Sequence, residues 1–117
     1  MAQEKVDIQI TDHEAYRILK PTGDLDVYTV GSLRDAIGRM IEEGTPRVVV
    51  DLDSVPFMDS SGLGALMGGV RRLREAGGDL AIACTREQHL KLFSITGFGE
   101  GVSISPTVEE AAAGFKA

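Results

Sequence analysis

Residues 48–69 read VVVDLDSVPFMDSSGLGALMGG, and this stretch decides the fold. It opens with three β-branched valines, a run typical of a strand that is buried on both faces. From about Ser61 the apolar side chains recur at helical spacing, and Gly77-Gly78 ends the pattern. The apolar positions of this helix are Leu63, Leu66, Met67, Val70 and Leu73. The stretch therefore predicts a buried strand, a short loop and an amphipathic helix.

Working outward, strand and helix patterns continue to alternate. Strands are predicted over residues 6–10, 16–20, 80–84 and 102–105, and a helix with 3.6-residue periodicity over residues 30–41. Two capping-box patterns, Thr85 with Gln88 and Thr107 with Glu110, predict the starts of the last two helices. The order β-β-α-β-α-β-α-β-α predicts an α/β fold, with a mixed, mostly parallel sheet of about five strands and four helices.

Composition excludes several classes of function. The chain has 117 residues, 12 basic and 18 acidic, and a formal net charge of −6. This length predicts one domain spanning residues 1–117. The negative charge argues against a nucleic-acid-binding face and against docking to an anionic membrane. Because Cys84 is the single cysteine and the first residues lack an apolar signal segment, we expect a reduced, cytoplasmic protein.

The chain offers no obvious set of catalytic or metal-binding side chains. His13 and His89 are far apart in sequence, and with one cysteine they form no zinc-ligand pattern. We therefore expect neither a metal nor a cofactor. Cys84 is expected to be a buried residue without a redox role.

Asp59-Ser60-Ser61-Gly62 stands at the start of the helix that follows the valine strand. Local sequence leaves several interpretations open, the simplest being that Asp59 or Ser60 is an N-cap. Gly62-x-Gly64 resembles a phosphate-binding glycine loop, but it lies inside the helical pattern. A nucleophilic serine would need a nearby base, and His89 has no evident carboxylate partner. Asp51 with Val55 to Asp59 resembles the phosphoacceptor loop of receiver domains, without their acidic pair or suitably placed lysine.

A family resemblance adds to this local analysis. The run Phe57-Met58-Asp59-Ser60-Ser61-Gly62-Leu63-Gly64 resembles the signature of STAS domains, specifically bacterial anti-sigma factor antagonists. Gly23-Asp24-Leu25-Asp26 resembles the acidic loop of that family. Residues 77–80 and 92–97 also fit the pattern. The similarity covers residues 6–115, so the resemblance implies a single STAS domain with that core.

The resemblance implies a partner switch. The unmodified protein is expected to bind an anti-sigma factor that is itself a serine kinase, and so to release a sigma factor. Ser60 is the expected phosphorylation site, and a PP2C-type phosphatase would reverse the modification. On this reading the chain is not an enzyme and has no catalytic residues of its own. The expected partner-binding residues are Asp26, Asp59, Ser60, Ser61 and Gly62.

Two alternatives keep the fold but change the role. A STAS domain can also serve as a scaffold or ligand-binding regulatory subunit, in a stress-sensing complex or a lipid transporter. A receiver-like domain phosphorylated on aspartate is the other alternative. We expect a monomer or weak dimer. The small residues Gly64, Ala65, Gly68 and Gly69 predict either close packing of the helix on the sheet or a flat docking surface.

Overall fold

The computed structural model describes residues 5–115 and forms a five-stranded sheet covered by helices on both faces. The strands lie in the order β1-β2-β3-β4-β5; β1 is antiparallel to β2, and all other pairs are parallel. The predicted α/β class, sheet type and element order are therefore confirmed. The strands are β1 (Asp7–Asp12), β2 (Arg17–Thr22), β3 (Arg47–Asp51), β4 (Asp79–Ala83) and β5 (Ile104–Ser105). The helices are α1 (Val30–Glu42), α2 (Ser60–Glu75), α3 (Glu87–Thr96) and α4 (Val108–Ala112), with a 3-10 turn η1 (Phe98–Glu100).

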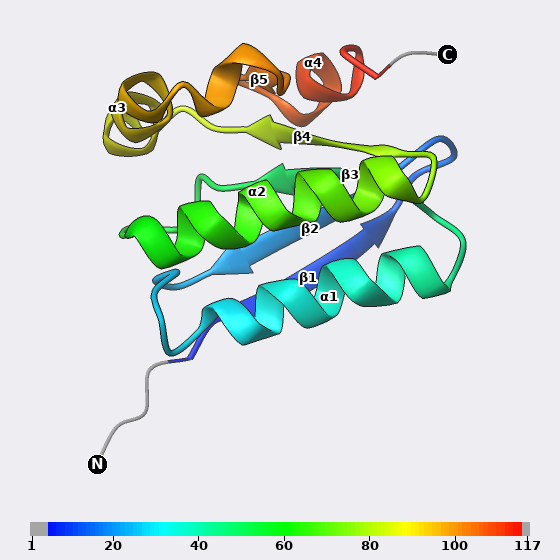
Figure 1. Cartoon of the computed structure of the whole chain (residues 1–117), viewed down its shortest axis with the longest axis horizontal. Coiled ribbons are helices and arrows are strands. Elements are labelled where there is room, and N and C mark those ends of the chain that lie inside the picture. The colour runs from blue at the N-terminus through cyan, green and yellow to red at the C-terminus, as the bar shows by residue number, and fades with distance from the viewer. Residues whose placement is uncertain (1–4, 116–117) are drawn as a thin grey trace.

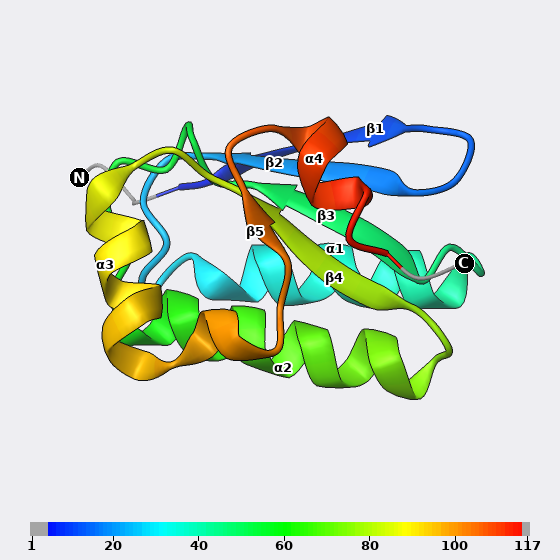
Figure 2. The same ribbon diagram turned by 90° about the horizontal axis from the view of Figure 1, so that it is seen from above.

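The helices divide unequally between the two faces of the sheet. Helices α1 and α2 lie side by side on one face, while the short α4 lies on the other (Figures 1 and 2). The main core forms between the first pair and the sheet, with Leu19, Ile37 and Leu66 fully buried in it. A smaller cluster of Tyr16, Val49, Ala81, Ala83 and Ala111 lies under α4. The valine strand β3 contributes to both clusters, which explains its continuous apolar run.

Helix α2 packs closely against α1 because one of its glycines has no side chain. A Cβ on Gly69 would lie 2.7 Å from Ile37 Cδ1 and 3.3 Å from Leu80 Cδ1. A Cβ on Gly64 or Gly68, by contrast, would meet nothing within 4 Å. Close packing is therefore confirmed for Gly69, whereas Gly64 and Gly68 face open space.

One predicted helix start is wrong. Helix α3 begins at Glu87 with Arg86 as its N-cap, and no side chain caps it. Asp53 Oδ1 instead accepts the Thr85 hydroxyl at 3.1 Å and the Thr85 backbone N–H at 2.6 Å. A distant loop thus binds the backbone N–H that the capping box would pair with Gln88. At the second predicted capping box only the N-cap bond is confirmed, since Thr107 Oγ1 accepts the backbone N–H of Glu110 at 3.1 Å. The Glu110 carboxylate accepts the Thr107 hydroxyl at 3.1 Å, where a full capping box would have it accept the Thr107 backbone N–H.

The carboxyl ends of β2, β3 and β4 meet at one end of the molecule (at the left in Figure 1). The β2–α1 loop, the β3–α2 loop and the start of α3 therefore lie together there. The β1–β2 hairpin and the C-terminal ends of α1 and α2 lie at the opposite end. This arrangement places Asp59 and Ser60 among loops that are distant in sequence.

Candidate functional site

The first turn of α2 forms the centre of the site. Asp59 is the N-cap in an extended conformation, and its Oδ1 accepts the backbone N–H groups of Ser61 at 2.8 Å and Gly62 at 3.3 Å. The N-cap interpretation of Asp59 is therefore confirmed. Ser60 is the first helical residue, and it is exposed. Ser60 therefore lies at the positive end of a 16-residue helix. Asp59 already binds two of the N–H groups that have no partner within the helix.

The β2–α1 loop, residues 23–26, lies against the loop that leads into Ser60. The backbone N–H of Leu25 donates to the Phe57 carbonyl at 2.9 Å, and the Asp59 N–H donates to the Leu25 carbonyl at 3.2 Å. Leu25 and Met58 thereby form a parallel bridge outside the main sheet. The structure thus brings Asp26 to the same end of the molecule as Ser60, as the sequence motifs implied.

Gly62 makes this close approach of the two loops possible. A Cβ at this position would lie 2.5 Å from Met58 Cγ and 3.0 Å from the Leu25 carbonyl oxygen. Gly62 is itself buried, whereas Ser61, Asp59 and Asp26 are partly exposed. Of the five residues predicted to bind a partner, Gly62 therefore shapes the site from beneath the surface.

Asp26 adopts a fixed conformation in front of α1. Its Oδ1 accepts the Tyr28 N–H at 2.9 Å, and its carbonyl accepts the N–H groups of Thr29 at 3.1 Å and Val30 at 3.0 Å. Thr29 is buried and its hydroxyl contacts the same loop, donating to the Asp24 carbonyl at 2.7 Å. Sequence reasoning missed Thr29, although a threonine directly before the predicted helix at Val30 was a usable signal.

On its other side, the β3–α2 loop is held by the segment between β4 and α3. Asp53 Oδ1 accepts the Thr85 N–H at 2.6 Å, and the Asp53 carbonyl accepts Arg86 Nε–H at 2.8 Å. His89 is buried, and its Nε2 donates to the Val55 carbonyl at 2.6 Å. The Nε2–H of this imidazole is therefore committed to a backbone contact within the core.

Other chemistries find little support among residues 5–115. No group of three His, Cys, Asp or Glu side chains in this range could hold a metal ion. Cys84 is buried, and desolvation by burial raises the pKa of its thiol. Asp51 uses its Oδ1 to accept the Asp53 N–H at 3.1 Å, and Lys91 lies on the exposed side of α3. No helix within the described range is long and apolar enough to cross a membrane.

Exposed apolar side chains gather on the elements that surround Ser60. Val27 and Tyr28, in the β2–α1 loop, are 64 % and 81 % exposed. Phe57 lies in the β3–α2 loop, and Met67 lies about two turns along α2 from Ser60. Gly64, Met67, Gly68 and Arg71 line an open hollow on the same helix. Exposed apolar side chains beside acidic residues such as Asp26 and Asp59 are typical of a protein-binding surface.

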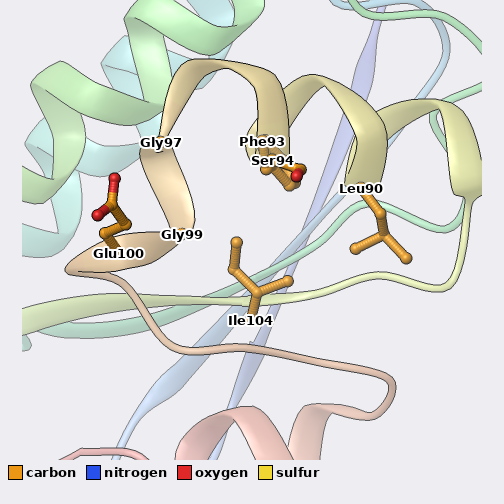
Figure 3. Close-up of a pocket in the computed structure, with 7 residues that line it drawn as sticks. All are labelled: Leu90, Phe93, Ser94, Gly97, Gly99, Glu100 and Ile104. Carbon is orange, nitrogen blue, oxygen red and sulfur yellow. The ribbon is translucent and has the colours of Figure 1, made fainter.

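A second hollow lies away from these residues, between α3, η1 and β5 (Figure 3). Its volume is about 400 Å³, and its walls include Leu90, Phe93 and Ile104. Glu100 is the one ionisable side chain in its wall. The hollow therefore presents mainly apolar surface and offers no catalytic group pair.

Known proteins resemble this chain in sequence and in fold. Residues 6–111 match the family model described as STAS domain. An anti-sigma-B factor antagonist of Staphylococcus epidermidis is 35 % identical over 104 residues, which cover 89 % of this chain and 96 % of that protein. An anti-sigma factor antagonist from Mycobacterium paratuberculosis has a similar structure, with TM-score 0.77, 25 % identity and 92 % of each chain covered. The phosphorylated form of the Bacillus protein SpoIIAA matches with TM-score 0.71 and 26 % identity, covering 92 % of this chain and 97 % of that one.

Proposed function

The chain belongs to the STAS domain family, and from that premise we propose that it acts as an anti-sigma factor antagonist controlled by phosphorylation of Ser60. The observation that carries the proposal is the exposed Ser60 hydroxyl at the start of α2, beside Asp59 and the Asp26 loop. The unmodified face binds an anti-sigma factor and thereby releases a sigma factor. Asp26, Asp59 and Ser61 contribute to this face, and Gly62 lets its two loops meet.

The anti-sigma factor in this proposal is also a serine kinase. Its bound ATP transfers the γ-phosphoryl group to Ser60 Oγ, ADP leaves, and a base of the kinase takes the hydroxyl proton. A PP2C-type phosphatase then uses water to release inorganic phosphate and restore the hydroxyl. This chain is the substrate in both reactions, so it needs neither a cofactor nor catalytic residues. We place it in the cytoplasm, as a monomer or weak dimer.

Electrostatics explain how one phosphate could release the partner. Asp59 already occupies the N–H groups of Ser61 and Gly62, so the helix offers a phosphate on Ser60 little internal compensation. The added charge of about −1.5 to −2 therefore stays at the surface, where the partner meets it. At about 4 Å and an effective dielectric near 20, one like-charge contact costs on the order of 4 kcal/mol. Such a cost corresponds to about a thousandfold loss of affinity.

The fold should not change on phosphorylation, because an exposed N-terminal helical residue has room for the group. SpoIIAA supports this view at the level of the overall fold, since both its phosphorylated and its unphosphorylated form share the fold of this chain with TM-score 0.71. Superposable structures of the modified and unmodified chain are the expected result. A displaced α2 in the modified protein would contradict a switch based on local charge.

The test is to copurify the partner from the source cell and to incubate the complex with ATP and Mg²⁺. We expect phosphate on Ser60, loss of binding in Ser60→Asp, and a Ser60→Ala variant that binds but accepts no phosphate. Ser61→Ala tests the site of modification and should still be phosphorylated; its affinity is not compared, because Ser61 contributes to the binding face. Acid treatment separates the receiver alternative, because a serine ester survives acid whereas an aspartyl phosphate hydrolyses. If neither Ser60 variant changes the affinity for the anti-sigma factor, a scaffold or ligand-binding role replaces the proposal.

A further inference from the structure

Two polar side chains are buried in the part of the chain that the structure describes, Thr29 at 3 % exposure and His89 at 2 %. Buried polar groups are costly unless they are hydrogen-bonded, so what they bind shows what they do. Both bind loops of the site around Ser60. Thr29 contacts the 23–26 loop, and His89 contacts the β3–α2 loop that leads into Asp59.

Thr29 stands at the N-cap position of α1 but does not cap the helix with its side chain. An N-cap threonine ordinarily accepts a backbone N–H from the first helical turn. Here the hydroxyl turns back, donating to the Asp24 carbonyl at 2.7 Å and accepting the Asp26 N–H at 3.0 Å. The hydroxyl thus binds the backbone on both sides of Leu25, in the loop that carries Asp26, and makes no capping bond to the first turn of α1.

His89 plays the corresponding part on the other loop. It reaches from α3 through the core to the Val55 carbonyl, 34 residues away in sequence. Because a carbonyl can only accept, the imidazole must carry its proton on Nε2. The neighbouring contacts of Thr85 and Arg86 with Asp53 fix the same loop from the surface.

The two loops also bind each other, but through backbone groups. Gly23 N–H donates to the Ser54 carbonyl at 3.1 Å, in addition to the Leu25 contacts with Phe57 and Asp59. Backbone pairing sets the register of the loops, whereas Thr29 adds a side-chain contact from the start of α1 and His89 adds one from α3. A loop held by both backbone pairing and a buried side chain presents its side chains in one arrangement.

We propose that Thr29 and His89 are positioning residues, which hold the Asp26 loop and the Ser60 loop so that one partner surface meets both. This inference rests on the proposed function, because it concerns recognition of the anti-sigma factor. Neither side chain touches the partner, since both are buried. Their removal should therefore weaken binding without removing any contact group.

Matched variants separate positioning from plain stability. Thr29→Val removes the hydroxyl with little change of shape, and Thr29→Ser keeps it. His89→Phe removes the donor, and His89→Gln places an amide N–H near the position of Nε2. We expect affinity for the anti-sigma factor, measured well below the melting temperature, to fall by about tenfold or more in the two removing variants. The two conservative variants should stay within about threefold of the unchanged chain, since they keep the hydrogen bond.

Amide hydrogen exchange supplies a readout that needs no partner. In Thr29→Val the Asp26 amide should exchange about tenfold faster, because it has lost its acceptor, while amides in β3 and β4 keep their rates. The unchanged chain gives a check without any substitution, since the buried Thr29 hydroxyl proton should exchange slowly enough to be seen by NMR. A rapidly exchanging hydroxyl, or a uniform rise in exchange across the sheet, would overturn the positioning role.

The outcomes of the binding experiment are distinct. If the unchanged chain does not bind the anti-sigma factor, the proposed function is wrong and so is the role in recognition; hydrogen exchange then tests only whether Thr29 holds the Asp26 loop. If the unchanged chain binds and Thr29→Val and His89→Phe bind equally well, the positioning role is wrong and the proposed function stands. If the removing variants bind weakly and their conservative counterparts bind normally, both are supported.

Discussion

Three glycines of α2 should respond to the same substitution in two opposite ways. Gly64 and Gly68 face open space, and glycine in a helix interior costs about 0.8–1 kcal/mol relative to alanine. Gly64→Ala and Gly68→Ala should therefore each stabilise the fold by nearly that amount. In Gly69→Ala the new methyl group would lie 2.7 Å from Ile37 Cδ1, in a fully buried part of the core. Overpacking of this kind costs about 1–3 kcal/mol, which exceeds the gain in helix propensity.

The expected shifts in melting temperature follow from the size of the chain. The entropy of unfolding is about 2.1 cal/mol/K per residue, or roughly 0.25 kcal/mol/K for 117 residues. A change of 1 kcal/mol in the free energy of unfolding therefore moves the melting temperature by about 4 °C. We expect rises of about 3–4 °C for Gly64→Ala and Gly68→Ala, and a fall of up to about 8 °C for Gly69→Ala.

Thermal and urea unfolding of the three variants, side by side with the unchanged chain, measure these shifts. The reasoning is refuted if Gly69→Ala is as stable as Gly68→Ala, or if Gly64→Ala lowers the melting temperature. Gly64→Ala also tests whether the exposed face of α2 is a flat docking surface. There the added methyl group should weaken partner binding while it stabilises the fold. Unchanged affinity would exclude that surface and leave the stability prediction intact.

Further predictions concern three other positions. Asp59→Ala should destabilise the fold by about 1 kcal/mol in urea unfolding, because it exposes two helix N–H groups, and Asp59→Asn should recover most of the loss; equal losses in both would contradict the capping role. Burial raises the pKa of the Cys84 thiol, so a disulfide reagent should modify it slowly in the native protein and rapidly in urea. Because the pKa of the thiol is higher in the folded chain, its contribution to stability should be complete below the ordinary thiol pKa of about 9 and should be lost as the pH rises above it. The melting temperature should therefore fall more steeply with pH in the unchanged chain than in Cys84→Ala, melted across the same pH range. Gly97→Ala should cost about 1 kcal/mol, since Gly97 ends α3 in the left-handed region at φ 73°, and an unchanged melting temperature would contradict this.

Periodicity predicted the elements of this fold well, because the decisive signals are local. The valine run of β3 and the apolar stripe of α2 both indicate which faces are buried, and such faces are covered by neighbouring elements in any folded domain. The Asp59 cap could also be predicted, since its partners are the residues two and three positions further along. Contacts between residues so close in sequence can be predicted from a single sequence.

Long-range contacts set the limits of that prediction. The Thr85 capping box failed because Asp53, 32 residues away, takes its hydroxyl and backbone N–H. The buried roles of Thr29 and His89 depend on which loops the topology brings to the same end of the sheet. A lone histidine in a helical pattern gives no local sign of a carbonyl 34 residues earlier. The sequence motifs thus named the exposed residues of the site and the buried Gly62, but not the buried side chains of Thr29 and His89 that hold its loops.

The two arginines in the last turn of α2 lie too far from Ser60 to neutralise a phosphate on it. Arg72 and Arg74 are about 20 Å along α2 from Ser60, at 1.5 Å per residue. Arg74 is also engaged by Asp79 at 2.9 Å, and Arg72 donates to the Arg34 carbonyl at 3.4 Å. With a Debye length of about 8 Å at physiological salt, charges at this separation are largely screened from each other. The same screening means that a phosphate repels a partner only near contact, so phosphorylation should raise the dissociation rate far more than it lowers the association rate.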